Sequence, residues 1–246
     1  MPTIKRRIFS GSICEQEVFN IPDKVKNLSK AEPQERFKTD EDRARHREEI
    51  SRRHFIRIVN STFSPKSLYS TLTLDNDHEV YNFEDAKRIV NNYIRRLKYI
   101  EPDAQIVLVT GRGKSTDRIH FHMISNGLSE EQIRQRWKGG NVKHIKPLRK
   151  NNYYNEVNHG QDYTALANYL FNHWTAEQGG HRWKATKNII QPEREEPTIV
   201  KRNYTESKPP KAPKGYKLVE ARSNQYGYLY FKYVRIYNEK QKNLRH

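Results

Sequence analysis

Two histidines, His120 and His122, stand two residues apart in the segment RIHFHMIS, residues 118–125. The segment alternates in hydropathy and predicts a β-strand, in which side chains two residues apart share one face. Both imidazoles therefore point the same way, and together they can bind one divalent metal ion if a third ligand comes from elsewhere in the chain. The alternative is a pair of exposed histidines on an open sheet face.

A second candidate group lies in the segment DYTALANYLFNHW, residues 162–174. Its apolar spacing predicts a helix that Asp162 caps and whose buried stripe includes Tyr163. Tyr169 and His173 fall off this stripe and lie one turn apart. A tyrosine hydroxyl can attack a phosphodiester and form a covalent phosphotyrosine, aided by a divalent ion that the histidine pair and His173 can hold. The alternative for Tyr169 is a half-buried tyrosine whose hydroxyl reaches water.

The elements around these residues alternate in a regular order. Three further strands are predicted at 69–74, 105–110 and 141–148, and two further helices follow Asn82 and Ser129. The order β-α-β-β-α-β-α predicts an α+β fold of the split βαβ type (ferredoxin- or RRM-like), with a central antiparallel sheet backed by helices.

Composition divides the chain into four predicted parts. Residues 1–60 are expected to be a charged N-terminal extension, with a solvated helix over 35–53. Residues 61–190 are expected to hold the chemistry. The segment 191–215, which is rich in proline and lysine, predicts a linker, and 216–246 predicts a hairpin with a basic tail.

The net charge favours a polyanionic partner. Lysine and arginine exceed the acidic residues to give +17 over 246 residues, while aromatic residues make up 11%. A folded domain of this charge is typical of nucleic-acid binding, although ribosome-associated and anionic-lipid-binding proteins share the property. No apolar run is long enough to span a membrane, so no membrane partner is expected. The single cysteine, Cys14, excludes a disulfide scaffold and is typical of a reducing cytoplasm.

Basic residues near the predicted strands and helices are candidates for DNA contacts. They are expected to form a phosphate-binding groove on one sheet face, where exposed tyrosines could stack on unpaired bases. The alternative for each one is an ordinary solvated charge. The candidates are Arg112, Lys114, Arg118, Lys143, Lys146, Arg149, Arg182, Lys184 and Lys187.

The segment 118–125 resembles the hydrophobic-His-hydrophobic-His-hydrophobic motif of the HUH endonucleases, the rolling-circle replication initiators of plasmids and phages. YSTLTL, residues 69–74, resembles their first motif strand, and 162–174 resembles the helix that carries their nucleophilic tyrosine. Within that family the chain is similar to the plasmid or phage Rep group related to filamentous-phage gene II protein, over roughly residues 9–237.

This resemblance implies sequence-directed nicking and religation of one DNA strand at a replication origin. A 5′-phosphotyrosine forms and a free 3′-OH is left as primer, with Mg²⁺ or Mn²⁺ as the expected ion. Carried over by position, Tyr169 is the nucleophile, His120 and His122 are metal ligands, and His173 matches the third ligand of single-tyrosine HUH transposases. The implied partners are single-stranded or origin DNA and a separate helicase and polymerase of a bacterial host.

The chain departs from the family pattern at two places. Many relatives have lysine three residues after the tyrosine, where this chain has Asn172, so the role of that lysine would fall to Lys184 or Lys187. Many initiators have a glutamate ligand where this chain has Thr110 and Gly111. The third ligand is therefore expected to be His173, with weaker alternatives in Glu156, His159 and Gln161.

Other functions have less support from the residues. Gly113-Lys114-Ser115 is only part of a P-loop, because Leu108 stands where that motif needs glycine, so no nucleotide is expected as ligand. Two alternative functions stay open. One is a non-catalytic module that binds single-stranded nucleic acid, and the other is a transposase with the same tyrosine chemistry.

Overall fold

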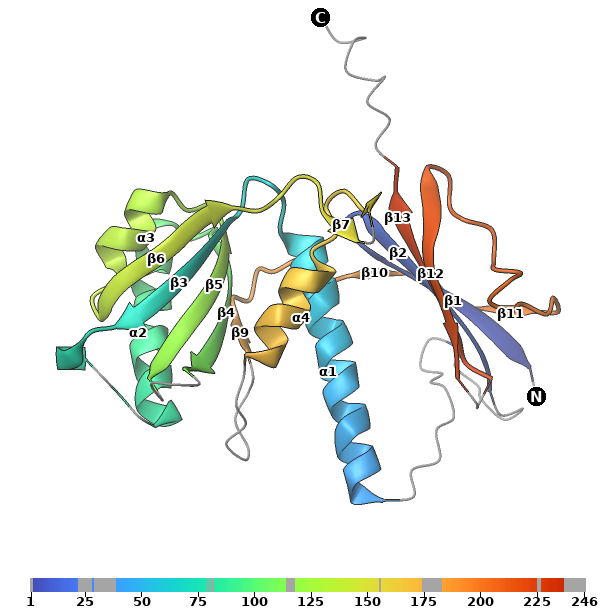
Figure 1. Ribbon diagram of the computed structural model, residues 1–246, viewed down its shortest axis with the longest axis horizontal. Coiled ribbons are helices and arrows are strands. Elements are labelled where there is room, and N and C mark those ends of the chain that lie inside the picture. The colour runs from blue at the N-terminus through green and yellow to red at the C-terminus, as the bar shows by residue number, and fades with distance from the viewer. Residues whose placement is uncertain are drawn as a thin grey trace, which may run out of the picture. The chain divides into compact units, whose positions relative to one another are not determined.

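In the computed structural model, the chain folds into two units (Figure 1). The central unit comprises Arg52–Lys150 and Tyr163–Ile190. The terminal unit comprises Met1–Ser51, Asn151–Asp162 and Gln191–His246. The structure describes residues 2–21, 28, 39–78, 80, 82–113, 118–154, 156–173, 183–224 and 227–236.

The central unit is built on one five-stranded antiparallel sheet. Its strands lie in the order β6-β3-β5-β4-β9. The register places His122 of β5 opposite Thr71 of β3 and His120 opposite Gly111 of β4. The strands are β3 (Leu68–Leu74), β4 (Gln105–Arg112), β5 (Ile119–Asn126), β6 (Gly140–Pro147) and β9 (Trp183–Ala185).

Two helices, α2 (Phe83–Ile100) and α3 (Glu130–Arg136), cover one face of this sheet (Figure 1). Both begin as the sequence predicts. The side chain of Asn82 accepts a hydrogen bond from the Asp85 amide, and Ser129 forms a capping box with Gln132. Tyr93 of α2 is fully buried against this sheet, where its neighbours include Phe121 of β5.

The opposite face of the sheet is covered in part by α4 (Thr164–Asn172) and the C-terminal end of α1 (Asp40–Thr62). The N-terminal half of α1 is largely exposed, as the predicted solvated helix requires, but Phe55 and Ile58 are buried in the core. The predicted extension over 1–60 therefore ends too late. Its last turns belong to the central unit, because the charged segment gives way to apolar residues that need burial.

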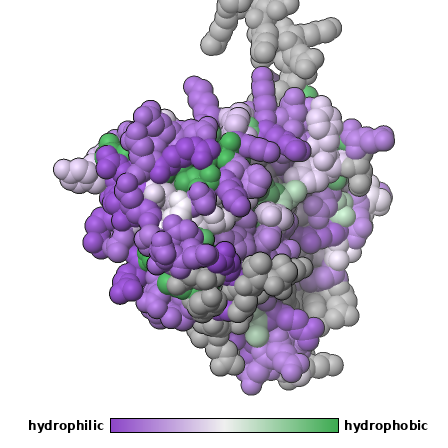
Figure 2. Space-filling view, turned by 60° about the vertical axis from the view of Figure 1, so that its left-hand side comes forward, coloured by the Kyte–Doolittle hydropathy of each residue, from purple (hydrophilic) through white to green (hydrophobic). Residues whose placement is uncertain are grey.

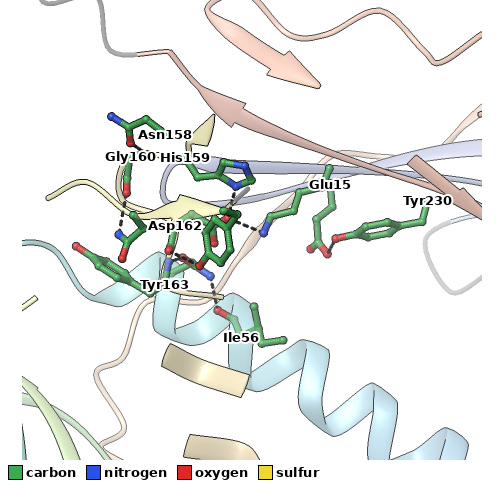
Figure 3. Close-up of polar contacts among 12 residues, drawn as sticks. Glu15, Ile56, Asn158, His159, Gly160, Asp162, Tyr163 and Tyr230 are labelled. Carbon is green, nitrogen blue, oxygen red and sulfur yellow. Dashed lines mark hydrogen bonds and ion pairs between the residues drawn. The ribbon is translucent and has the colours of Figure 1, made fainter. Parts of the chain in front are cut away.

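The helix α4 begins differently from the prediction. Tyr163, and not Asp162, occupies its N-cap position, and no side chain caps it. Asp162 is fully buried and instead binds Lys232 Nζ at 2.6 Å and His159 Nδ1 at 3.2 Å (Figure 3). A buried carboxylate binds a partner of opposite charge more strongly than a backbone amide, which explains why the cap is lost. Tyr163 itself is buried, as predicted.

The terminal unit holds a second antiparallel sheet, in which the two ends of the chain meet. Its main strands lie in the order β10-β1-β2-β13-β12, and β11 pairs with β1. A two-stranded sheet of β7 and β8 completes the unit. The strands are β1 (Thr3–Ser10), β2 (Ile13–Asn20), β7 (Tyr153–Tyr154), β8 (Val157–Asn158), β10 (Glu193–Arg194), β11 (Thr198–Val200), β12 (Tyr216–Ser223) and β13 (Leu229–Arg235).

The predicted boundaries of the outer segments differ from this arrangement. The expected C-terminal hairpin forms as β12 and β13, but β13 also pairs with β2, so the hairpin is integral to a larger sheet. The segment expected as a linker, 191–215, supplies β10 and β11 to the same sheet. Long-range strand pairing of this kind leaves little trace in local composition.

Buried polar groups link the strands of the terminal unit. Arg6 and Glu17 form an ion pair at 2.5 Å with both side chains buried. Tyr230 Oη donates to Glu15 Oε1 at 2.8 Å (Figure 3). Buried carboxylates are stable only when such partners satisfy them, so these pairs fix how β1, β2 and β13 align.

The described residues thus form an α+β fold of helices and antiparallel sheets, as the sequence predicts. Among them, no helix is both long enough and apolar enough to cross a membrane. Most side chains on the face drawn in Figure 2 are hydrophilic. This surface is in keeping with a mean hydropathy of −1.06.

Candidate metal centre and tyrosine

Strand β5 presents its two histidines on the face of the sheet that α2 and α3 leave uncovered. His120 and His122 alternate with Ile119, Phe121 and Met123, which are buried in the core on the α2 side. The ring centroids of the two histidines lie 4.9 Å apart. The predicted geometry of the pair is confirmed, and its rings are at most half exposed.

His173, at the C-terminal end of α4, joins this pair. Its ring centroid lies 4.8 Å from that of His122 and 6.1 Å from that of His120. One ligand nitrogen from each of the three rings falls within 4.8 Å of the others. Three imidazole nitrogens this close together can hold a divalent metal ion after small rotations of the rings.

His122 is oriented by a hydroxyl from the neighbouring strand. Tyr69 Oη of β3 lies 2.7 Å from His122 Nδ1, and Thr71 Oγ1 lies 3.2 Å from Tyr69 Oη. The other ring nitrogen, Nε2, is buried and has no hydrogen-bond partner among the described residues. An orphaned buried nitrogen fits a metal ligand, because the hydrogen bond at Nδ1 leaves Nε2 as the nitrogen free to bind.

His120 depends on a glycine opposite it. A Cβ atom placed on Gly111 would lie only 2.8 Å from His120 Nε2. Gly111 therefore leaves the space that the imidazole occupies. Any larger side chain at position 111 would meet the ring of His120.

The histidines of the strand are held in the neutral form. Burial, together with the nearby His120 and His173, lowers the pKa of His122 to about 3. Burial also lowers the pKa of His120 below its ordinary value. Neutral imidazole is the form that binds a metal ion, so at neutral pH these two side chains need lose no proton before they bind one.

Tyr169 lies beside the three histidines. Its ring centroid is 4.2 Å from that of His173 and 5.8 Å from that of His122, and its side chain is 49% exposed. The helical wheel predicted this position, because Ala167 and Leu170 face the core on the opposite side of α4. A phenol that is reachable from solvent and adjacent to a candidate metal site is placed to react with a bound phosphodiester.

Position 172 contacts a cation from another helix. Arg52 of α1 donates from Nη1 to Asn172 Oδ1 at 3.1 Å, and its guanidinium lies over the Phe171 ring at 5.0 Å. Sequence reasoning looked for a replacement lysine in Lys184 or Lys187 and missed this arginine. Arg52 and Asn172 are 120 positions apart in the chain, so their contact depends on the packing of α1 against α4.

The weaker ligand alternatives do not belong to this group. His159 Nδ1 lies 3.2 Å from the buried carboxylate of Asp162, which accepts its hydrogen bond, and Glu156 is exposed in a turn with a φ of 65°. Among the described residues, the grouping of potential metal ligands consists of the three histidines alone. Within the central unit, the structure thus brings His173 to the pair formed by His120 and His122.

Two of the predicted DNA-contacting residues lie on the histidine face of the sheet. Lys143 pairs with Thr71 and Lys146 pairs with Tyr69 across β3 and β6. Directly paired residues project to the same side, so both lysines share the face of His122. Arg118 stands just before β5, exposed, and donates from Nη2 to Asn76 Oδ1.

Two other predicted contacts lie on the wrong face. Arg112 pairs with Ile119 and Lys184 pairs with Leu108, and both partners belong to the core beneath α2. Lys184 Nζ donates to Asn91 Oδ1 of α2. Neither side chain can join a groove on the histidine face, because a strand residue is committed to one side of the sheet by its register.

The remaining predicted contacts lie apart from the histidines or outside the described residues. Lys187 is exposed in a turn. The next residue, Asn188, donates from its side chain to Asp103 O, just before the start of β4, whereas Gly111 lies near the end of that strand. Arg149 is exposed after β6, where the chain returns to the start of β3. Lys114 and Arg182 lie outside the described residues.

Sequence reasoning missed Tyr69, Thr71 and Gly111 as parts of the site. The alternation of β3 indicated that Tyr69 and Thr71 share a face. The register then showed that this face lies beside His122 of β5.

In comparisons with protein-family models, curated proteins and solved structures, no match to this chain is found.

Proposed function

We propose that this protein is a metal-dependent DNA-nicking enzyme of the HUH type that initiates rolling-circle replication. The observation that carries the proposal is the meeting of Tyr169 with three histidines, with the Tyr169 and His173 ring centroids 4.2 Å apart. A nucleophile and a cation site at this separation are what phosphodiester transfer to a tyrosine needs.

The topology of the central unit supports the same proposal. Its first four strands in chain order, β3, β4, β5 and β6, lie in the sheet order 4-1-3-2, with α2 and α3 as the crossovers. This order supports the proposed split βαβ fold, and the two middle strands of the sheet, β3 and β5, carry two of the histidines and their hydrogen-bonding partners.

The chemistry assigned to the chain is one exchange of ester bonds. Tyr169 Oη attacks the phosphorus of the scissile phosphate, the phenol loses its proton to solvent, and a phosphotyrosine forms at the 5′ end. The bond from phosphorus to the 3′ oxygen breaks, and that oxygen takes up a proton as a free 3′-OH. Religation is the reverse reaction and needs no nucleotide triphosphate, because the phosphotyrosine keeps an ester bond.

His120, His122 and His173 are the residues that would hold Mg²⁺ or Mn²⁺. When bound there, the ion would offset the charge that develops on the phosphate oxygens. Lys143 and Lys146, on the same face of the sheet, would bind neighbouring phosphates of the strand.

The test is the formation of a covalent adduct. The protein is incubated with Mn²⁺ and a single-stranded oligonucleotide library of random sequence, and the products are separated on a denaturing gel. We expect a protein–DNA adduct that Tyr169→Phe and EDTA abolish. Tyr99→Phe, which changes an exposed tyrosine of α2, is the matched control and should leave the adduct unchanged.

Two results would contradict the proposal. An adduct that persists in Tyr169→Phe would place the nucleophile elsewhere. Oligonucleotides that bind but stay intact with every divalent ion would instead support the non-catalytic binding module.

A further inference from the structure

A cavity of about 650 Å³ opens beside His120 in the central unit. It lies where β3 ends, β5 begins and β6 begins, and the short 3₁₀ helix η2 (Asn76–His78) forms part of its wall. We call it the β3–β5–β6 pocket. Its lining residues are Thr73, Leu74, Asp75, Asn76, Asp77, Arg118, Ile119, His120, Asn141 and Lys143.

The pocket is continuous with the candidate metal centre. Thr73 pairs with His120 on one side and with Asn141 on the other, so the three residues form a row across the sheet. Two strand spacings separate His120 from Asn141, which is about 10 Å. One nucleotide unit spans a comparable length from its phosphate to the far edge of its base.

The walls of the pocket are fixed by the core beneath them. Trp137 Nε1 donates to Thr73 O at 3.2 Å, and the Asp75 amide donates to Gly139 O at 3.0 Å. Gly140 has a φ of 138°, and a Cβ there would lie 2.5 Å from the Asp75 nitrogen. The end of β3 and the start of β6 are thus held close together, and the pocket exists before any ligand arrives.

The charged and amide groups of the pocket are suited to different parts of a nucleotide. Arg118 and Lys143 are exposed cations that can bind phosphate oxygens. Asp77 and Asn141 are exposed as well and offer oxygen acceptors, whereas Asp75 is engaged with His78 Nδ1 at 2.6 Å. Carboxylate and amide oxygens accept hydrogen bonds from the exocyclic amino groups of adenine, cytosine and guanine, which thymine lacks.

We infer that the β3–β5–β6 pocket binds one nucleotide of the single strand, next to the phosphate held at the histidines, and selects against thymine there. This inference rests on the proposed function for the identity of the strand. Asn141 and Asp77 read the base, Lys143 binds its phosphate, and the pocket sets part of the sequence that the enzyme cuts.

The test measures binding, so that it needs no cleavage. Single strands that the protein retains from a randomised library in Mn²⁺ are sequenced, with circular dichroism to verify that each variant is folded. Wild type is expected to deplete thymine at one position. Asn141→Ala and Asp77→Ala should each reduce that preference about tenfold while Mn²⁺ affinity stays unchanged.

A phosphate contact has a different signature. Lys143→Gln should weaken binding of all sequences alike and reduce the slope of log K against log salt by about 0.7. Lys66→Gln is the matched control, because Lys66 is an exposed lysine that precedes the opposite end of β3. Lys66→Gln should leave the base preference unchanged and should reduce the slope by less than Lys143→Gln does.

Several outcomes overturn the inference. The first is a library without any base preference in wild type, and the second is a preference that both pocket variants leave intact. The third is dAMP or dCMP binding as tightly as the selected strand, measured by amide shifts at Asn141, because the pocket would then serve a free nucleotide. If the selection succeeds while no tyrosine adduct forms, the proposed function fails and the pocket stands.

Discussion

The candidate site depends on residues other than the three histidines and Tyr169. Tyr69 contributes a hydroxyl at 2.7 Å from His122 Nδ1, and Gly111 contributes the absence of a side chain opposite His120. A histidine ring that binds a metal ion must be oriented so that the correct nitrogen faces the ion, and it must have space in that position. These two residues supply one condition each.

Replacing Tyr69 by phenylalanine tests the first condition. The variant removes the closer of the two hydroxyl partners of His122 Nδ1 and leaves only Thr71 Oγ1 at 3.4 Å, so the hydrogen bond that orients Nε2 towards the ion is weakened. We expect Mn²⁺ affinity to fall about 10- to 100-fold, measured by calorimetry. Tyr99→Phe should leave affinity unchanged, and an equal affinity in Tyr69→Phe would mean that the hydroxyl does not orient His122.

Replacing Gly111 by alanine tests the second condition. The new Cβ would lie 2.8 Å from His120 Nε2, so the imidazole has to move away from its position in the group of three. We expect weaker binding of Co²⁺, followed by its visible absorption, with a circular dichroism spectrum like that of wild type. Thr110→Ala, one position earlier in β4, serves as control. Wild-type Co²⁺ affinity in Gly111→Ala would show that the ring can shift without loss.

At the scale of elements, α1 joins an exposed charged half to a buried apolar end. Phe55 is fully buried, and its ring contacts those of Phe171 on α4 and Trp183 on β9 at centroid distances of 6.1 and 5.3 Å. These contacts hold α4, and with it Tyr169 and His173, against the sheet. The end of α1 is thus part of what positions the site.

The substitution Phe55→Ala measures this contribution. It should lower the free energy of unfolding by about 3–5 kcal/mol, because a large buried ring leaves a cavity that its neighbours fill only in part. Ile50→Ala changes a residue that is 54% exposed on the same helix and should alter stability by about 0.5 kcal/mol or less. Denaturant unfolding of both variants provides the comparison, and similar losses in the two would refute the assigned packing of α1.

At the scale of the whole molecule, neither unit is a continuous stretch of chain. The terminal unit takes its sheet from both ends, with β2 lying between β1 and β13. Glu15 and Glu17 of β2 accept hydrogen bonds from Tyr230 and Tyr228. Removing the C-terminal strands would take away these two tyrosine donors from the buried carboxylates.

A deletion of residues 216–246 should therefore unfold the terminal unit selectively. We expect amide hydrogens in β1 and β2 to lose protection from exchange, because β13 no longer covers the edge of β2. Amides of β4 and β5 should keep theirs. Deleting only 237–246, which follow β13, is the control. Intact protection in β2 after the larger deletion would show that the hairpin is dispensable.

The thiol of Cys14 reports on the same unit. It is fully buried in β2, and burial raises its pKa to about 12. Folding therefore favours the neutral thiol, so stability should fall as pH rises from about 9 towards 12. Because the thiolate is the reactive form, labelling by a disulfide reagent at pH 8 should be at least about 1000-fold slower than in denaturant. Labelling at the rate of a free thiol would contradict this burial.

The sequence by itself determined the periodic features of this protein. Alternation placed His120 and His122 on one face, the helical repeat separated Tyr169 from the buried Tyr163, and side-chain caps marked the starts of α2 and α3. Each of these depends on residues a few positions apart, whose relation is set by backbone geometry alone.

Only the tertiary structure decided which residues from distant parts of the chain lie next to these features. The strand register put Lys184 and Arg112 on the face away from the histidines, and it put Tyr69 within reach of His122. A one-residue shift in pairing would reverse either assignment, and nothing local in the sequence sets that shift. Asp162 likewise left its predicted cap for Lys232, because a buried carboxylate is stabilised most by a cation that lies 70 positions away along the chain.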